Sequence, residues 1–232
     1  MASSNNTLVY PDDKASLRIL NELVTLFSGY NIVNQILLFG SHTRGDWDRW
    51  SDIDLLLITS GGFTQQWHLF NVLKQGKSIL HHHTFTPHVD PYGSNVLGIV
   101  FTNESVFHNL DLNFMSAVEF ESSENIRRFG QSKQLYFSET YKAQVVFDED
   151  EQIPNFEVNL EERKIGNRIH WTKKAIKHTL RQHDGYPELR RQLLLLDEIM
   201  KNYPEGKPML GGDICRLARI YLEIGTLLLA DG

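Results

Sequence analysis

The chain has 232 residues, of which 41% are hydrophobic and 22% charged, with only 7 Pro, a composition typical of a folded globular protein rather than a disordered or fibrous one. Its single cysteine, Cys215, excludes an internal disulfide and favours a reduced, intracellular setting. The polar N-terminus has no apolar core of a signal peptide, and no apolar run approaches the roughly 18 residues that span a membrane. We therefore expect a cytoplasmic protein that does not enter a membrane.

The net charge of −6 is spread unevenly along the chain. Residues 1–157 carry 10 basic and 19 acidic residues, a net charge of −9, whereas residues 158–232 carry +3. An acidic N-terminal part disfavours the basic, phosphate-tracking surface of a nucleic-acid-binding protein. The charge distribution favours a small-molecule substrate.

The N-terminal part opens with a segment of helical period, Asp13–Phe27, and continues with short runs typical of strands. Two further segments have helical character, Phe63–Leu73 and Ser123–Tyr136. These elements predict a mixed α/β unit, a β-sheet flanked by helices. The predicted strands are Gln35–Phe39, Ile53–Thr59, Ser78–Val89, Val96–Thr102, Val106–Phe114 and Ala143–Phe147.

The hydrophobic period changes near Pro154, after which three segments of helix length follow. They are Leu160–His183, Pro187–Asn202 and Gly212–Leu229, separated by turn-rich connections. We therefore predict two domains, an α/β domain over residues 1–157 and a three-helix domain over residues 158–232, whose apolar faces are compatible with a homodimer.

The residues that indicate chemistry lie around the predicted strand Ile53–Thr59. Asp52 and Asp54 flank Ile53, and because side chains alternate along a strand, both carboxylates project from one face. Like charges held so close repel unless a cation neutralises them. Mg²⁺ accepts few protein carboxylates and completes its shell with water and substrate phosphates, so it is the ion that this pair favours.

The turn before these acids fits a phosphate. Gly40 ends an apolar run and lets the backbone approach an anion closely, while Ser41 supplies a hydroxyl and an N–H at the start of a short helical segment. Arg44 follows within one turn and its guanidinium matches phosphate oxygens, although an ion pair with Asp46 or Asp48 is an equal alternative. Acids and turn together favour phosphoryl or nucleotidyl transfer.

Gly40-Ser41, an eleven-residue step from Ser41 to Asp52, and Asp-x-Asp on an apolar strand resemble the DNA polymerase β-like nucleotidyltransferase superfamily. The resemblance implies an NTP as co-substrate, two Mg²⁺ ions, and a third acid on a neighbouring strand. We expect this acid to be Asp111, on the polar face of an alternating run, acting as metal ligand and general base. Asp90, which precedes a proline, and Glu104 are the alternatives.

The order of elements around Asp111, a strand pair, then a helical segment, then a helical C-terminal part, resembles the lincosamide nucleotidyltransferase group of antibiotic-modifying enzymes. That resemblance implies transfer of a nucleoside monophosphate to a hydroxyl of a small molecule, with release of pyrophosphate. A protein of a different kind is the alternative: an antitoxin-like member that binds or AMPylates a partner protein.

Overall fold

The structure is a computed structural model that describes residues 13–60, 63–85, 95–121, 129, 131–138, 160–182, 184–203 and 214–231. The chain divides into two compact units, Met1–Ile79 with Thr84–Pro154, and Leu80–His83 with Asn155–Gly232. The strand predicted over Ala143–Phe147 lies outside the described residues. In the described part of the chain, no helix is long and apolar enough to cross a membrane.

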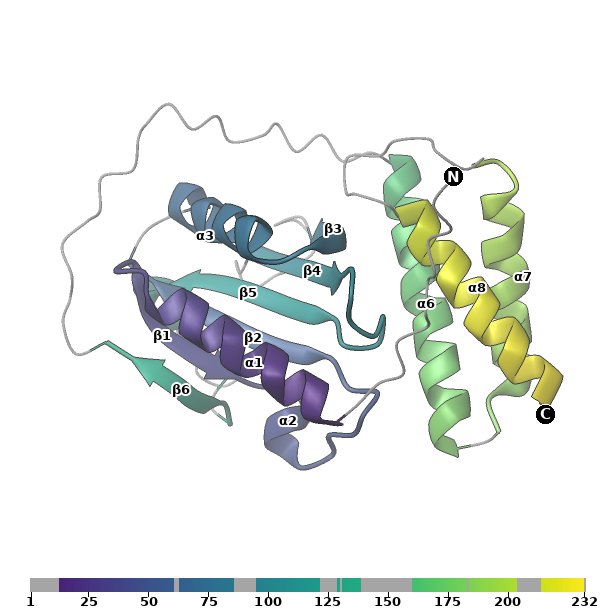
Figure 1. The fold of residues 1–232 in the computed structure, drawn as a ribbon, viewed down its shortest axis with the longest axis horizontal. Helices are drawn as coiled ribbons and strands as arrows, with labels where there is room; N and C mark the ends of the chain where they lie inside the picture. The colour runs from purple at the N-terminus through teal and green to yellow at the C-terminus, as the bar shows by residue number, and fades with distance from the viewer. Residues whose placement is uncertain are drawn as a thin grey trace. The chain divides into compact units, whose positions relative to one another are not determined.

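The helices and strands described up to residue 138 are labelled in chain order in Figure 1. They are α1 (Asp13–Ser28), β1 (Val33–Leu38), α2 (Ser41–Arg44), β2 (Ile53–Thr59), α3 (Phe63–Gly76), β3 (Ile79–Phe85), β4 (Asn95–Phe101), β5 (Leu110–Ser116), α4 (Ala117–Phe120) and β6 (Lys133–Phe137). The predicted helix Asp13–Phe27 and the predicted strand Ile53–Thr59 are thereby confirmed.

The strands described form a six-stranded sheet in the order β3-β4-β5-β2-β1-β6. β2 and β5 run parallel at its centre, whereas β1 pairs antiparallel with β2 and with β6, and β4 pairs antiparallel with β5. The sheet is therefore mixed, which confirms the predicted α/β class with a mixed sheet flanked by helices.

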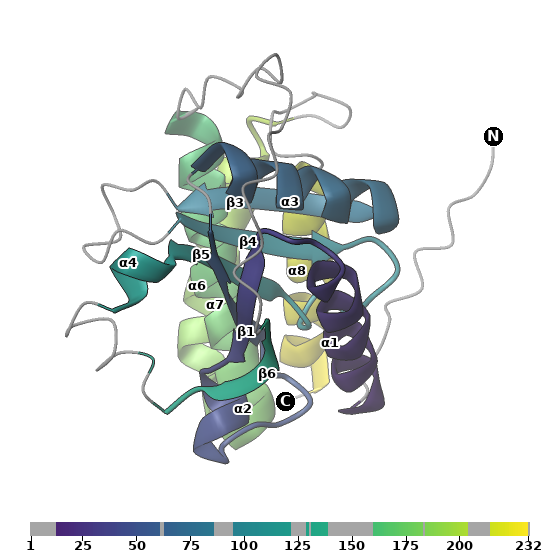
Figure 2. The ribbon, with the colours of Figure 1, turned by 90° about the vertical axis from the view of Figure 1, so that its left-hand side faces the viewer.

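Each face of the sheet has its own apolar cluster. On one face, Ile53, Leu55 and Leu57 of β2 pack with α1 and α3 in the main core. On the other face, Leu56 and Ile58 join a smaller cluster whose edge includes Ala117 and Phe120 of α4. Figure 2 accordingly shows α1 and α4 on opposite sides of the strands. The face with the smaller cluster is the one from which Asp54 projects, because residues 54, 56 and 58 alternate with the core residues.

Two predicted elements differ from the structure. β5 begins at Leu110, not at Val106, because residues 106–109 form a buried connection whose turn is closed by a hydrogen bond from His108 N to Ser105 O. The helix predicted over Ser123–Tyr136 is wrong at its end, where β6 pairs with β1. Pairing with the open edge of β1 gives the backbone groups of β6 partners and overrides local helical preference.

The second unit contains the three predicted C-terminal helices, α6 (Leu160–Gln182), α7 (Tyr186–Met200) and α8 (Ile214–Asp231). Gly225 lies at a close approach of α8 to α7, where a Cβ would lie 2.5, 2.8 and 3.0 Å from three side-chain carbons of Leu193. Because Gly225 has no side chain, Leu193 of α7 can pack directly against the backbone of α8.

This close approach predicts that the effect of Gly225→Ala depends on Leu193. Alanine is favoured over glycine inside a helix by about 1 kcal/mol, but overpacking costs about 1–3 kcal/mol. We expect Gly225→Ala to lower the free energy of unfolding by about 1 kcal/mol in the wild-type chain and to raise it when Leu193 is also alanine. Urea denaturation followed by circular dichroism measures both, and equal effects in the two backgrounds would contradict the packing.

Candidate active site

Gly40 fixes the turn between β1 and α2 and lies directly beneath the carboxylate of Asp54. Its φ of +70° and ψ of −145° lie in a backbone region that residues with a Cβ rarely adopt. A Cβ on Gly40 would lie 1.9 Å from Oδ2 of Asp54 and 2.7 Å from its Cγ. Phe39 N also donates to Asp54 O at 3.1 Å, so backbone and side chain of Asp54 both contact this turn. Only glycine fits between the turn and the acid.

Ser41 and Arg44 lie in the short helix that follows. Gly40 O accepts hydrogen bonds from Thr43 N at 3.2 Å, from Arg44 N at 3.3 Å and from Thr43 Oγ1 at 3.1 Å, which close the turn. The Ser41 hydroxyl is half-buried and makes no hydrogen bond to any residue that the structure describes. Arg44 is exposed and pairs with Asp46 at 3.1 Å, an interaction worth at most about 1 kcal/mol and thus easily exchanged.

The three predicted acids come from two neighbouring parallel strands. Asp54 of β2 and Asp111 of β5 are direct partners in the register, so their side chains leave the same face of adjacent strands. Asp52 immediately precedes β2, and Ile53 between the two acids is fully buried while all three acids are half-buried. Asp54 and Asp111 therefore lie near the starts of the two central strands, with Asp52 two residues before Asp54.

The arrangement of the three acids does not by itself form a metal site. Within the described residues, no group of three or more His, Cys, Asp or Glu side chains is positioned to hold a metal ion. The ligand set Asp52, Asp54 and Asp111 therefore stays a prediction.

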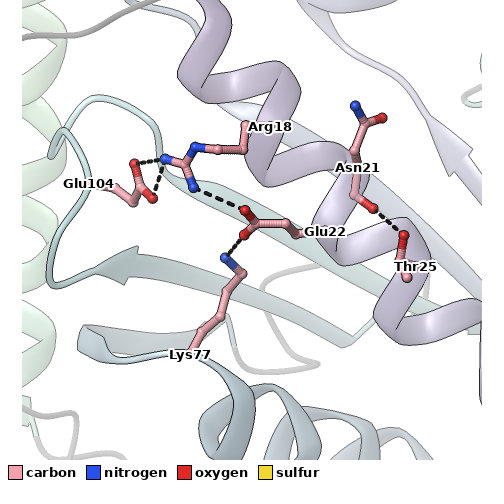
Figure 3. Close-up of polar contacts among 6 residues, drawn as sticks. All are labelled: Arg18, Asn21, Glu22, Thr25, Lys77 and Glu104. Carbon is pink, nitrogen blue, oxygen red and sulfur yellow. Dashed lines mark hydrogen bonds and ion pairs between the residues drawn. The ribbon is translucent and has the colours of Figure 1, made fainter.

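The alternatives for the third acid lie elsewhere. Both oxygens of Glu104 accept from the Arg18 guanidinium, at 2.6 and 2.8 Å, and Arg18 also pairs with Glu22, which contacts Lys77 (Figure 3). Glu104 thus belongs to an ion-pair network that joins α1 to the β4–β5 connection. Asp90 lies outside the described residues.

Asn113 has a role that the sequence pattern did not reveal. It lies two residues after Asp111 on the same face of β5, and only 3% of its surface is exposed. Its Nδ2 donates to Leu55 O at 3.4 Å and to Asp111 O at 3.3 Å. Asn113 therefore joins β2 to β5 beneath the acids. A polar side chain amid apolar neighbours was the only sequence signal for this role.

His42 and Trp47 pack together beside the turn, with ring centroids 4.9 Å apart. Burial, and secondarily the charge of His108, lowers the pKa of His42 to about 4, so the imidazole is neutral at neutral pH. Nε2 of His42 and Nε1 of Trp47 are buried and find no hydrogen-bond partner in the part of the chain that the structure describes. The sequence gave no signal for His42 beyond its position next to Ser41.

A glycine–serine turn against an acid that is paired with a second acid across parallel strands is compatible with a protein of the nucleotide-transferring class. The family model described as "Nucleotidyltransferase domain" matches residues 17–176, more than half of the chain. The chain belongs to the nucleotidyltransferase domain family. The resemblance to the DNA polymerase β-like superfamily is thereby confirmed, whereas the lincosamide group stays a prediction.

A search of curated proteins finds no match. Among solved structures, the chain is similar to the non-canonical poly(A) polymerase complex GLD-2–GLD-3, with 22% identity, a TM-score of 0.34, and coverage of 46% of this chain and 36% of that one. A terminal uridylyl transferase 4 from Trypanosoma brucei with bound CTP gives 14% identity, a TM-score of 0.31, and coverage of 92% and 64%. A putative nucleotidyltransferase from H. pylori gives 11% identity, a TM-score of 0.26, and coverage of 95% of this chain and 96% of that one. The chain therefore spans little more than a third of the first of these proteins.

The fit between Gly40 and Asp54 predicts a strong effect of adding one methyl group. Gly40→Ala should lower the free energy of unfolding by about 3 kcal/mol, because strain at positive φ adds to the contact with the carboxylate. Gly45 is a control for positive φ in the left-handed helical region, since its φ is +83° and its ψ 8° and no atom lies within 4 Å of the added Cβ. Gly45→Ala should therefore cost only the strain, about 1–2 kcal/mol. Chemical denaturation of both variants measures the difference, and equal losses would contradict the contact.

The lowered pKa of His42 predicts a pH-dependent loss of stability. Since the folded-state pKa of about 4 lies below the ordinary value of 6.5, the unfolded chain binds more protons between these values. Stability from this group is complete above the ordinary pKa and falls as the pH drops towards the folded pKa. Melting temperatures at about pH 7 and about pH 4.5 should differ less for His42→Gln than for the wild type. An unchanged difference would show that His42 does not cause the loss.

Proposed function

We propose that this chain transfers a nucleoside monophosphate from an NTP to a hydroxyl of a small-molecule acceptor, with release of pyrophosphate. One observation supports this most: Asp54 is paired with Asp111 across parallel strands while its carboxylate lies against Gly40, the residue before Ser41, whose hydroxyl has no hydrogen-bond partner among the described residues. In this proposal, donors for an anion and ligands for a cation lie side by side near the starts of the two central strands. We propose residues 1–157 as the catalytic domain and residues 158–232 as a helical domain.

The donor set suits a hard divalent cation. The three acids offer only oxygen ligands and are half-buried, so each keeps some access from solvent. Asp52, Asp54 and Asp111 would hold Mg²⁺, in our proposal two ions, and part of the coordination shell would come from the triphosphate and water. Bound Mg²⁺ would neutralise the charge of the phosphates and stabilise the charge that develops during transfer.

The chain's own residues supply the remaining steps. The Ser41 hydroxyl and the Gly40 turn bind the phosphates, and Arg44 exchanges Asp46 for a phosphate oxygen. Asp111 accepts the proton of the acceptor hydroxyl, whose oxygen forms a bond to the α-phosphorus. The bond between the α-phosphorus and the bridging oxygen breaks in line, and pyrophosphate leaves with the electron pair.

The acceptor is the finer part of the proposal. Net charge of −9 over residues 1–157 disfavours a polyanionic acceptor, which leaves neutral or cationic hydroxyl compounds. Antibiotics such as lincosamides and aminoglycosides belong to this class. A pyrophosphate-release screen of the four NTPs against them, against other hydroxyl compounds and against RNA with a free 3′ hydroxyl tests the acceptor class. Transfer to RNA alone, or to a co-purifying protein alone, would overturn the small-molecule acceptor.

The roles of the acids predict graded losses on neutralisation. Asp54→Asn and Asp52→Asn should abolish pyrophosphate release, whereas Asp111→Asn should lower kcat by about 10²–10⁴-fold, the size of a general-base contribution. Asp197→Asn on α7 is a suitable control, because Asp197 is exposed and pairs only with Lys201 on its own helix in the part of the chain described. Steady-state kinetics at saturating Mg²⁺ measures these effects. Full activity of a folded Asp54→Asn variant would sink the proposed mechanism.

A further inference from the structure

The second half of the connection between β4 and β5, residues 105–109, is buried to an unusual degree for a chain segment between strands. Ser105, Phe107 and His108 expose only 2%, 4% and 1% of their surface. His108 is the last ring before the strand that carries Asp111. A buried imidazole at this place needs a hydrogen-bond partner to offset the loss of water.

The partner of His108 lies in the other acid-bearing segment. Its Nε2 is 3.0 Å from Arg49 O, in the turn that precedes Asp52. A carbonyl oxygen can only accept, so Nε2 carries the proton and donates it. The turn itself is closed by Asp48, whose Oδ1 accepts from Trp50 N at 3.0 Å and from Ser51 Oγ at 2.9 Å. The carbonyl is therefore held by a rigid turn.

Two other contacts join the same two segments. Trp50 and Phe107 meet edge to face with ring centroids 5.1 Å apart. Ile53 N donates to Asn109 O at 2.8 Å, at the start of the parallel pairing between β2 and β5. Of these contacts, the His108 bond is the one that joins a side-chain donor to the turn immediately before Asp52.

We propose that His108 is a positioning residue that sets the separation of Asp52 and Asp111 through its hydrogen bond to Arg49 O. The inference rests on the proposed function, since it concerns the geometry of the same three acids. His108 does not touch the reacting atoms in this proposal. It acts on the acids through the backbone, as partners of metal ligands commonly do.

Three substitutions test the proposal. His108→Phe keeps an aromatic ring but removes the donor, whereas His108→Gln retains an N–H at similar reach. Glu104→Gln is the matched control, because it breaks the Arg18 contact on the other side of the same connection without touching the turn (Figure 3). Comparable melting temperatures of the variants establish that all are folded.

The first readout is the affinity for Mn²⁺ alone, measured by electron paramagnetic resonance. We expect His108→Phe to bind about tenfold more weakly than the wild type, His108→Gln to recover most of the affinity, and Glu104→Gln to stay within about twofold. The second readout is the kinetic split: in His108→Phe, kcat should fall about tenfold while KM for the NTP changes little. Wild-type affinity and kcat in His108→Phe would overturn the proposal.

A third readout needs no substitution. The ¹⁵N spectrum of the wild-type imidazole should show His108 as the Nε2–H tautomer, and an Nδ1–H tautomer would overturn the proposal even if His108→Phe does not fold. Mn²⁺ binding by a wild type that releases no pyrophosphate would overturn the proposed function and leave the role of His108 standing. Absence of Mn²⁺ binding by the wild type would overturn both.

Discussion

The carboxylate of Asp54 lies against the bare Cα of Gly40, and the rest of the site depends on this contact. It requires a residue without a Cβ at positive φ, so the turn after β1 and the acid on β2 constrain each other. A glycine in such a turn is usually explained by the approach of a phosphate. Here an acid already occupies part of that space, so the same glycine positions both the proposed cation ligand and the proposed phosphate site.

Parallel pairing of β2 with β5 fixes the position of Asp111, as the contact with the Gly40 turn fixes that of Asp54. In-register pairing sets the two acids opposite each other, and the main core on the far face fixes which residues of each strand face the site. A slip of one residue would move Asp111 to the core side. Asp54 and Asp111 are therefore held on adjacent strands. Two carboxylates on adjacent strands repel each other when both are charged, and a bound cation would offset this repulsion. Cation and nucleotide binding would then contribute to stability by mass action.

Much of this could be predicted from local pattern. Alternation around Ile53 predicted that Asp54 lies on the face opposite the core residues of β2, and a glycine–serine pair between apolar runs predicted a turn. Local pattern was insufficient where contacts between residues far apart in the chain determine the secondary structure or the burial of a residue. Residues 133–137 are a strand because β1 offers an open edge, and Asn113 is buried because carbonyls of two strands accept its amide hydrogens. His108 could not be singled out, since its partner is a backbone atom 59 positions away in the chain.

The contacts that position the acids differ in kind from those that would bind substrate. Asp54, Asp111 and the turn before Asp52 are held by backbone register, buried rings and a glycine, none of which can adjust without cost. Arg44 and Ser41, by contrast, have an exposed ion pair and a hydroxyl without a described partner, which a phosphate can replace or use at little cost. In the proposed function, the acids are fixed in place before the cation binds. The groups that contact the phosphates change partners when the nucleotide binds.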